Sequence, residues 1–200
     1  MTRGVVMVAY GEQVDISERR ASEALTHICP DLPVHVHRRR TGQANDSAES
    51  RYAKVTLLDW TPFEHTAYLD ADTQVIQPID AGFKMLTDGW DLVITHDTNQ
   101  SEHNWLWHCG DADKEFTILS LRYQALQLQA GVFFVAKNER TAALWDAWRD
   151  EWQVYGNQDQ GALLRALQRV SVRLWLLGRP WNGGAVIGHH FGAIRRNGNG

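Results

Sequence analysis

Residues 65–73 read His-Thr-Ala-Tyr-Leu-Asp-Ala-Asp-Thr. The first five residues predict a short buried strand that runs straight into Asp70 and Asp72. Two carboxylates two residues apart can point the same way when the backbone turns at a strand end. Such pairs suit hard divalent cations such as Mg²⁺ or Mn²⁺, which also take phosphate oxygens. The position directly after a buried strand makes a metal site more plausible, and a solvated turn remains the equal alternative.

The rest of the chain alternates between apolar runs and segments of helical periodicity. Strands are expected over residues 5–10, 32–37, 92–95 and 129–136, with short strands or turns over 74–79 and 186–187. Helices are expected over residues 15–28, 52–58, 140–152 and 160–170, and the polar stretch 41–50 is a loop or a helix start. This order predicts an α/β fold with a mostly parallel sheet in one domain, residues 1–200. Residues 9–11 and 70–72 then lie at the same edge of the sheet.

Composition excludes several classes of protein. The chain has 200 residues, 44% of them hydrophobic, and a net charge of −4, so no global positive charge favours nucleic acid or an anionic membrane. The two cysteines, Cys29 and Cys109, lie far apart, which fits a reducing compartment. No segment is apolar enough for a signal peptide or a membrane span. We therefore expect a cytoplasmic protein.

Five segments, in this order along the chain, resemble motifs of the GT-A-fold glycosyltransferases. The closest resemblance is to family 8, which includes glycogenin and bacterial lipopolysaccharide galactosyltransferases. The segments are Arg51-Tyr52-Ala53-Lys54, Tyr68-Leu69-Asp70-Ala71-Asp72-Thr73, Gln129-Ala130-Gly131-Val132, Gln158-Asp159-Gln160-Gly161 and His190-Phe191-Gly192. Each is weak alone, but five in order are specific. The resemblance implies a three-layer α/β/α sandwich with a mixed, mostly parallel central sheet.

The resemblance also implies an activity and a metal. It implies transfer of a sugar from a nucleotide-diphosphate donor, with UDP as the nucleotide, to a carbohydrate, lipid or protein acceptor, with retention of configuration. Mn²⁺ or Mg²⁺ would be held by Asp70, Asp72 and His190. His189 is the rival ligand, and His190 is preferred because Phe191 and Gly192 follow it as in the family.

The same resemblance assigns further residues to the donor and to catalysis. Asp159 and Gln160 would line the donor sugar as catalytic groups, although an acidic residue at a helix start explains Asp159 equally well. Lys54 would reach the phosphates or the sugar, with a solvated helix lysine as its alternative. The expected donor-binding residues are Ala9, Tyr10, Gly11, Lys54, Asp70, Ala71, Asp72, Gln129, Ala130, Gly131, Gly192 and Arg195. A disordered basic tail is an equal explanation for Arg195.

Three departures from the family pattern keep other functions open. Gln129 stands where relatives carry Asn, the tail lacks Lys-Pro-Trp, and the chain is shorter than most relatives. A binding protein of the same fold without turnover is one alternative. A sugar-phosphate nucleotidyltransferase ranks lower, because residues 11–13 do not form a Gly-rich basic loop.

Histidines, aspartates and tryptophans outside these motifs receive weaker assignments. The His/Asp-rich stretch 96–113 lacks zinc-site spacing and is better explained as a loop that offers Trp105 and Trp107 to the acceptor. Helical spacing places Trp145, Trp148 and Trp152 in the core, and Trp181 is the better candidate for a sugar platform.

Overall fold

A computed structural model describes residues 1–39, 42, 46–97, 105–106, 108–121, 126–156 and 158–190 of the chain. Within these residues, six strands form a central sheet in the order β2-β1-β3-β6-β5-β7, and β4 pairs with β8 in a small second sheet. The strands are β1 (Arg3–Tyr10), β2 (Val34–Arg39), β3 (His65–Leu69), β4 (Thr73–Val75), β5 (Leu92–His96), β6 (Leu128–Ala136), β7 (Leu174–Leu177) and β8 (Ile187–His189).

The central sheet is mixed and mostly parallel, as predicted. β1 runs parallel to both β2 and β3, and β5 runs parallel to β7. β6 runs antiparallel to β3 on one side and to β5 on the other. The carboxyl ends of β1 and β3 therefore lie at the same edge of the sheet, where the predicted aspartates follow β3.

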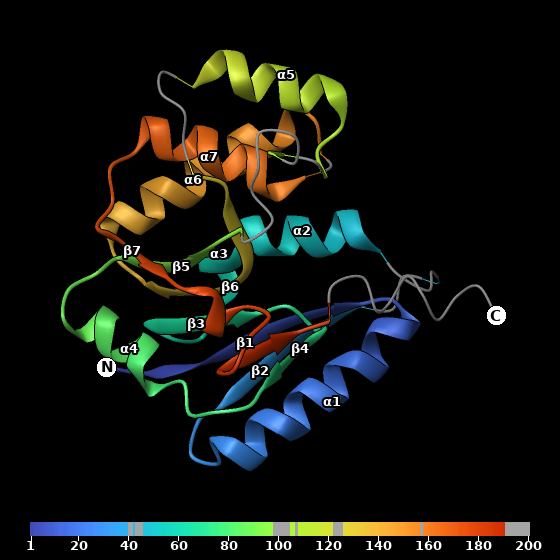
Figure 1. Ribbon diagram of the computed structural model, residues 1–200, viewed down its shortest axis with the longest axis vertical. Coiled ribbons are helices and arrows are strands. Elements are labelled where there is room, and N and C mark those ends of the chain that lie inside the picture. Colours follow the sequence, from blue (N-terminus) through green and yellow to red (C-terminus); the bar gives the residue numbers. More distant parts are fainter. Residues whose placement is uncertain are drawn as a thin grey trace.

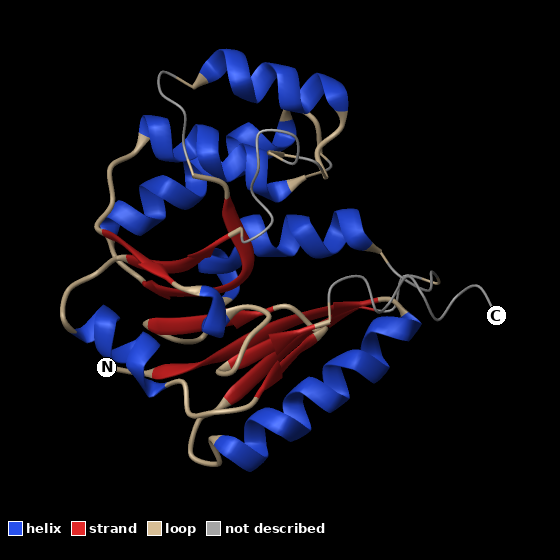
Figure 2. Cartoon of the chain, in the orientation of Figure 1, coloured by secondary structure: helices blue, strands red, loops and turns tan. Residues whose placement is uncertain are grey.

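Helices cover both faces of the sheet, which gives the three layers seen in Figures 1 and 2. The apolar residues of β1 alternate between the two faces: Val6 and Val8 pack with α2, α3, α6 and α7, whereas Val5 and Met7 pack with α1 and α4. α5 packs on α7. The helices are α1 (Glu12–Ile28), α2 (Ser47–Val55), α3 (Leu57–Trp60), α4 (Asp80–Thr87), α5 (Asp111–Ser120), α6 (Glu139–Gln153), α7 (Asp159–Arg169) and the 3₁₀ turn η1 (Arg179–Trp181).

The structure adds elements that the sequence pattern did not predict. α4, α5 and β7 are absent from the sequence-based assignment. The polar stretch before residue 52 begins α2, one of the two outcomes expected for it, and the Asp46 side chain accepts a hydrogen bond there from the Glu49 amide at 3.2 Å. α4 contains Gly82, whose ideal Cβ would lie 2.3 Å from the Phe134 ring. Glycine at this position therefore lets α4 pack closely on β6. Among the described helices, none is long and apolar enough to cross a membrane.

Candidate functional site

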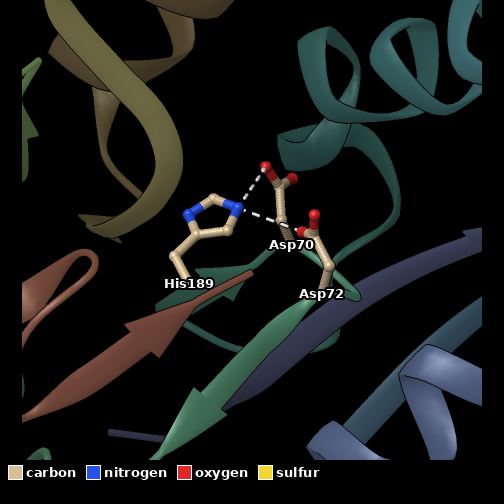
Figure 3. A group of neighbouring side chains, drawn as sticks. All are labelled: Asp70, Asp72 and His189. Atoms are coloured by element: carbon tan, nitrogen blue, oxygen red, sulfur yellow. Dashed lines mark hydrogen bonds and ion pairs between the residues drawn. The ribbon is translucent and has the colours of Figure 1, made fainter. Parts of the chain in front are cut away.

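The two aspartates after β3 sit in a tight turn, as the sequence predicted. The Thr73 amide and hydroxyl both donate hydrogen bonds to the Asp70 carbonyl, at 3.0 and 2.8 Å. The Asp70 amide donates to the Gly131 carbonyl of β6 at 2.8 Å, which ties the turn to the neighbouring strand. Both carboxylates thus project from one short, fixed segment toward the same space (Figure 3).

The histidine that meets these aspartates is His189, which differs from the expected His190. Nε2 of His189 lies 3.0 Å from Oδ1 of Asp72 and 4.0 Å from Oδ2 of Asp70 (Figure 3). β8 pairs antiparallel with β4, with Thr73 opposite His189, and successive side chains of a strand point to opposite sides. His190 consequently points away, and its Nε2 lies 3.5 Å from Oε1 of Gln74. We therefore take His189, in place of His190, as the candidate metal ligand.

Gly131 forms the wall of this site. An ideal Cβ on Gly131 would lie 2.6 Å from Cε1 of His189 and 2.7 Å from Oδ2 of Asp70. The pairing of β5 with β6 is irregular here, because Ile94 is opposite Phe133 while Thr95 is opposite Gln129. Glycine is needed because the candidate ligands approach the backbone too closely for any side chain.

The donor set fits a divalent cation. Among the described residues, one ligand atom each from Asp70, Asp72 and His189 can lie within 4.8 Å of the other two. Two carboxylate oxygens and one imidazole nitrogen match the preferences of Mn²⁺. The aspartate side chains remain 29% and 15% exposed, so further ligands can reach the same centre. This ligand chemistry fits a divalent cation, and a metal site here stays a prediction.

Lys54 is buried and joins the site to α7, so it is not a solvated helix lysine. Its Nζ lies 2.8 Å from Oδ2 of Asp159 and 3.2 Å from Oδ1 of Asp70. Burial alone would lower the pKa of Lys54, but the two carboxylates outweigh it and raise the pKa. Burial likewise opposes ionisation of Asp159, yet Lys54 and Arg51 keep the pKa of that carboxyl below its usual value. Both groups are therefore charged at neutral pH.

Two core tryptophans of α6 hold the residues of this ion pair in place. The indole N–H of Trp145 donates to the Lys54 carbonyl at 3.2 Å, and that of Trp148 donates to the Asp159 carbonyl at 2.8 Å. Both rings are buried, as their helical spacing predicted. Their hydrogen bonds give these rings a second role, since each anchors the backbone of a candidate site residue.

A buried amide network supports Gln160, and sequence reasoning missed it. Oε1 of Gln160 accepts a hydrogen bond at 3.0 Å from Nε2 of Gln127, which also donates to Oδ2 of Asp97 at 2.8 Å. Oε1 of Gln127 accepts from the amide of Leu106 at 2.7 Å, and Leu106 has a left-handed backbone with φ of 53°. The sequence signal that could have pointed to this network is the position of Asp97 directly after the apolar strand β5.

The remaining residues expected to bind the donor lie at different distances from the aspartate turn, and some of them are buried. Ala9 packs with Ala71, which brings the end of β1 beside the aspartate turn as predicted. Tyr10 is buried with its ring 5.6 Å from that of His37, and burial raises its pKa. The Gln129 side chain turns back to accept a hydrogen bond from the Gly131 amide. Ala130 is buried in β6, and Gly11 has the positive φ of 105° at the start of α1.

Several expected positions fall outside the described residues. Gly192, Arg195 and Trp107 lie in segments that the structure does not describe. Trp181, expected as a sugar platform, packs edge-on against Phe134 at 5.8 Å between ring centroids. The candidate site as described therefore consists of the aspartate turn, His189, Gly131 and the Lys54–Asp159 pair.

Solved structures share this architecture. A glycosyltransferase involved in the glycosylation of the major capsid of the virus PBCV-1 aligns over 98% of both chains, with a TM-score of 0.62 and 13% identity. The galactosyltransferase LgtC, solved with donor and acceptor sugar analogues, aligns over 86% of this chain and 72% of its own, with a TM-score of 0.55 and 14% identity.

A third similar structure is mouse xyloside xylosyltransferase 1. It aligns over 88% of this chain and 85% of its own, with a TM-score of 0.54 and 10% identity. No family model and no curated protein sequence matches the chain. Identities this low establish the fold and not the activity. The chain has the GT-A fold of the glycosyltransferases, as its motifs predicted.

Proposed function

We propose that this GT-A-fold chain is a metal-dependent glycosyltransferase. It transfers a sugar from a nucleotide-diphosphate donor to an acceptor that is a carbohydrate, a lipid or a protein. The observation that carries the proposal is the convergence of Asp70, Asp72 and His189 beside Gly131, at the carboxyl end of a strand in this fold. UDP as the nucleotide, and retention of configuration, rest on the sequence resemblance to family 8.

The chemistry follows from the charges at the site. Bound Mn²⁺ or Mg²⁺, held by Asp70, Asp72 and His189, would supply Lewis-acid neutralisation of the departing diphosphate. The residues of the chain position the metal ligands and limit the excess of negative charge at the site. Lys54 does this from within the core, because its ammonium lies against both Asp70 and Asp159. Its charge adds to the electrostatic stabilisation of the leaving group.

In this proposal, Asp159 and Gln160 contact the donor sugar. Asp159 stays ionised because of its pair with Lys54, so it accepts hydrogen bonds from sugar hydroxyls and does not serve as a general acid. Gln160 is an amide and a poor nucleophile, and its carbonyl oxygen already accepts a hydrogen bond from Gln127. We propose front-face transfer, in which the departing phosphate takes the proton of the acceptor hydroxyl.

The test is release of UDP from UDP-sugars with and without Mn²⁺. A transferase hydrolyses its donor slowly in the absence of acceptor, so Mn²⁺-dependent UDP release from one sugar of a panel supports the proposal. Asp72→Asn should abolish that release, since it removes one anionic ligand. Binding of a UDP-sugar with Mn²⁺ but without any release would favour the non-catalytic binding protein. No Mn²⁺-dependent binding of any nucleotide sugar would refute both.

A further inference from the structure

Asn182 directly contacts the candidate metal-binding histidine on the side away from the aspartates. It directly follows η1, is 4% exposed, and its Oδ1 lies 2.6 Å from Nδ1 of His189. Its Nδ2 donates to Oγ1 of the buried Thr95 in β5 at 2.9 Å. The Thr95 hydroxyl in turn donates to the carbonyl of Gln129 in β6 at 3.2 Å. One buried chain of hydrogen bonds thus runs from the central sheet to His189.

The direction of this chain follows from its last acceptor. A backbone carbonyl only accepts, so the Thr95 hydroxyl must donate its hydrogen to Gln129. The Thr95 oxygen then accepts from the amide nitrogen of Asn182, which leaves the carbonyl oxygen of Asn182 facing His189. That oxygen requires a hydrogen on Nδ1 of His189. Nε2 is then the nitrogen that can offer a lone pair to a cation; without a cation, Oδ1 of Asp72, which lies 3.0 Å from Nε2, accepts a hydrogen from it instead.

The segment that carries Asn182 is fixed independently of the histidine. The amides of Gly183 and Gly184 both donate to the Ile187 carbonyl, at 2.9 and 3.1 Å. An ideal Cβ on Gly184 would lie 2.6 Å from Cα of Pro180, so the turn is closed tightly. Asn182 is consequently a rigid partner, whereas β8 has only three residues and orients the imidazole poorly by itself.

We propose that Asn182 is a positioning residue for the metal. It holds His189 in the tautomer and ring orientation in which Nε2 binds the cation, and Thr95 fixes the direction of the Asn182 amide. Partners of this kind, on the far nitrogen of a ligating histidine, typically change metal affinity by about 10–100-fold. The affinity part rests on the proposed function; the tautomer part rests on the contact alone.

Two measurements separate these parts. The first is the ¹⁵N shift of Nδ1 of His189 in the metal-free protein, which reports whether Nδ1 carries a hydrogen. The second is a Mn²⁺ titration with UDP present, followed by the electron paramagnetic resonance signal of free Mn²⁺. Asn182→Leu should lose the Nδ1–H preference and bind Mn²⁺ about 10–100-fold more weakly. Asn182→Asp keeps an acceptor for Nδ1 and should retain most of the affinity.

Matched variants guard against misfolding. Thr95→Val preserves shape, removes the directing hydroxyl and should show the same tautomer change if Asn182→Leu does not fold. Gln74→Ala removes a partner of His190 instead and should change neither readout. Wild-type affinity in folded Asn182→Leu, or the absence of a hydrogen on Nδ1 in the wild type, would overturn the proposal. A wild type with the Nδ1–H tautomer that binds no Mn²⁺ would refute the proposed function and support only the contact.

Discussion

Replacing Gly131 by alanine tests whether the space between the candidate ligands holds a cation. The ideal Cβ lies 2.6 Å from Cε1 of His189, 2.7 Å from Oδ2 of Asp70 and 2.8 Å from Oε1 of Gln129. Nonbonded contacts between carbon atoms need about 3.5–4.0 Å, so these groups must retreat. The Gly131 backbone yields little, because its carbonyl accepts the Asp70 amide hydrogen bond at 2.8 Å.

The size of the effect follows from the tolerance of metal sites. Ligand distances must match to within about 0.2 Å, which a retreat of Asp70 and His189 from the new methyl group far exceeds. We expect the affinity of Gly131→Ala for Mn²⁺ to fall at least about 100-fold, or about 2.8 kcal/mol at about 1.4 kcal/mol per factor of ten. Overpacking costs folding only about 1–3 kcal/mol, so the variant should fold with a lower Tm.

The assay is the Mn²⁺ titration in the presence of UDP, with circular dichroism to confirm folding. Gly188→Ala is the matched control, because it neighbours His189 and its Cβ meets Cδ1 of Ile76 at 3.4 Å, an ordinary contact. The control should bind Mn²⁺ like the wild type. A folded Gly131→Ala protein with wild-type affinity would refute the reasoning, since the cation would then have to lie elsewhere.

Three further predictions concern the ligands and the ion pair. His189→Ala should weaken Mn²⁺ binding in the same titration far more than His190→Ala, and the reverse order would return the ligand position to His190. Lys54→Met removes the ammonium that contacts the buried Asp159 carboxylate and should lower the free energy of unfolding, measured in urea, by about 3–5 kcal/mol. Since the folded-state pKa of Asp159 is lowered, this difference in unfolding free energy should be present above about pH 4 and vanish as the pH falls through the lowered pKa. A difference that does not change with pH would contradict the pairing. Trp148→Phe keeps a buried aromatic ring but removes part of the indole and its hydrogen bond to the Asp159 carbonyl, and should cost at least about 1 kcal/mol in the same urea experiment; no loss would show that the contact is not stabilising.

The sequence predicted the sheet better than two of the helices that pack around it. Apolar strands such as residues 5–10 and 65–69 are recognisable because a strand buried on both faces carries almost no charge. α4 and α5 were missed, because one is short and interrupted by Gly82 and the other lies in a polar stretch. Their formation depends on packing against Phe134 and α7, which no local pattern encodes.

By itself, the sequence determined the strand that leads into Asp70 and the turn that carries both aspartates, because the hydrogen bonds of Thr73 to the Asp70 carbonyl are local. Only the tertiary structure decided which histidine joins them. The register of β8 against β4 chooses His189 over His190, and one residue of slip would exchange the two. The bonds of Asn182 to His189 and of Trp148 to Asp159 are likewise products of folding, since separate elements meet there.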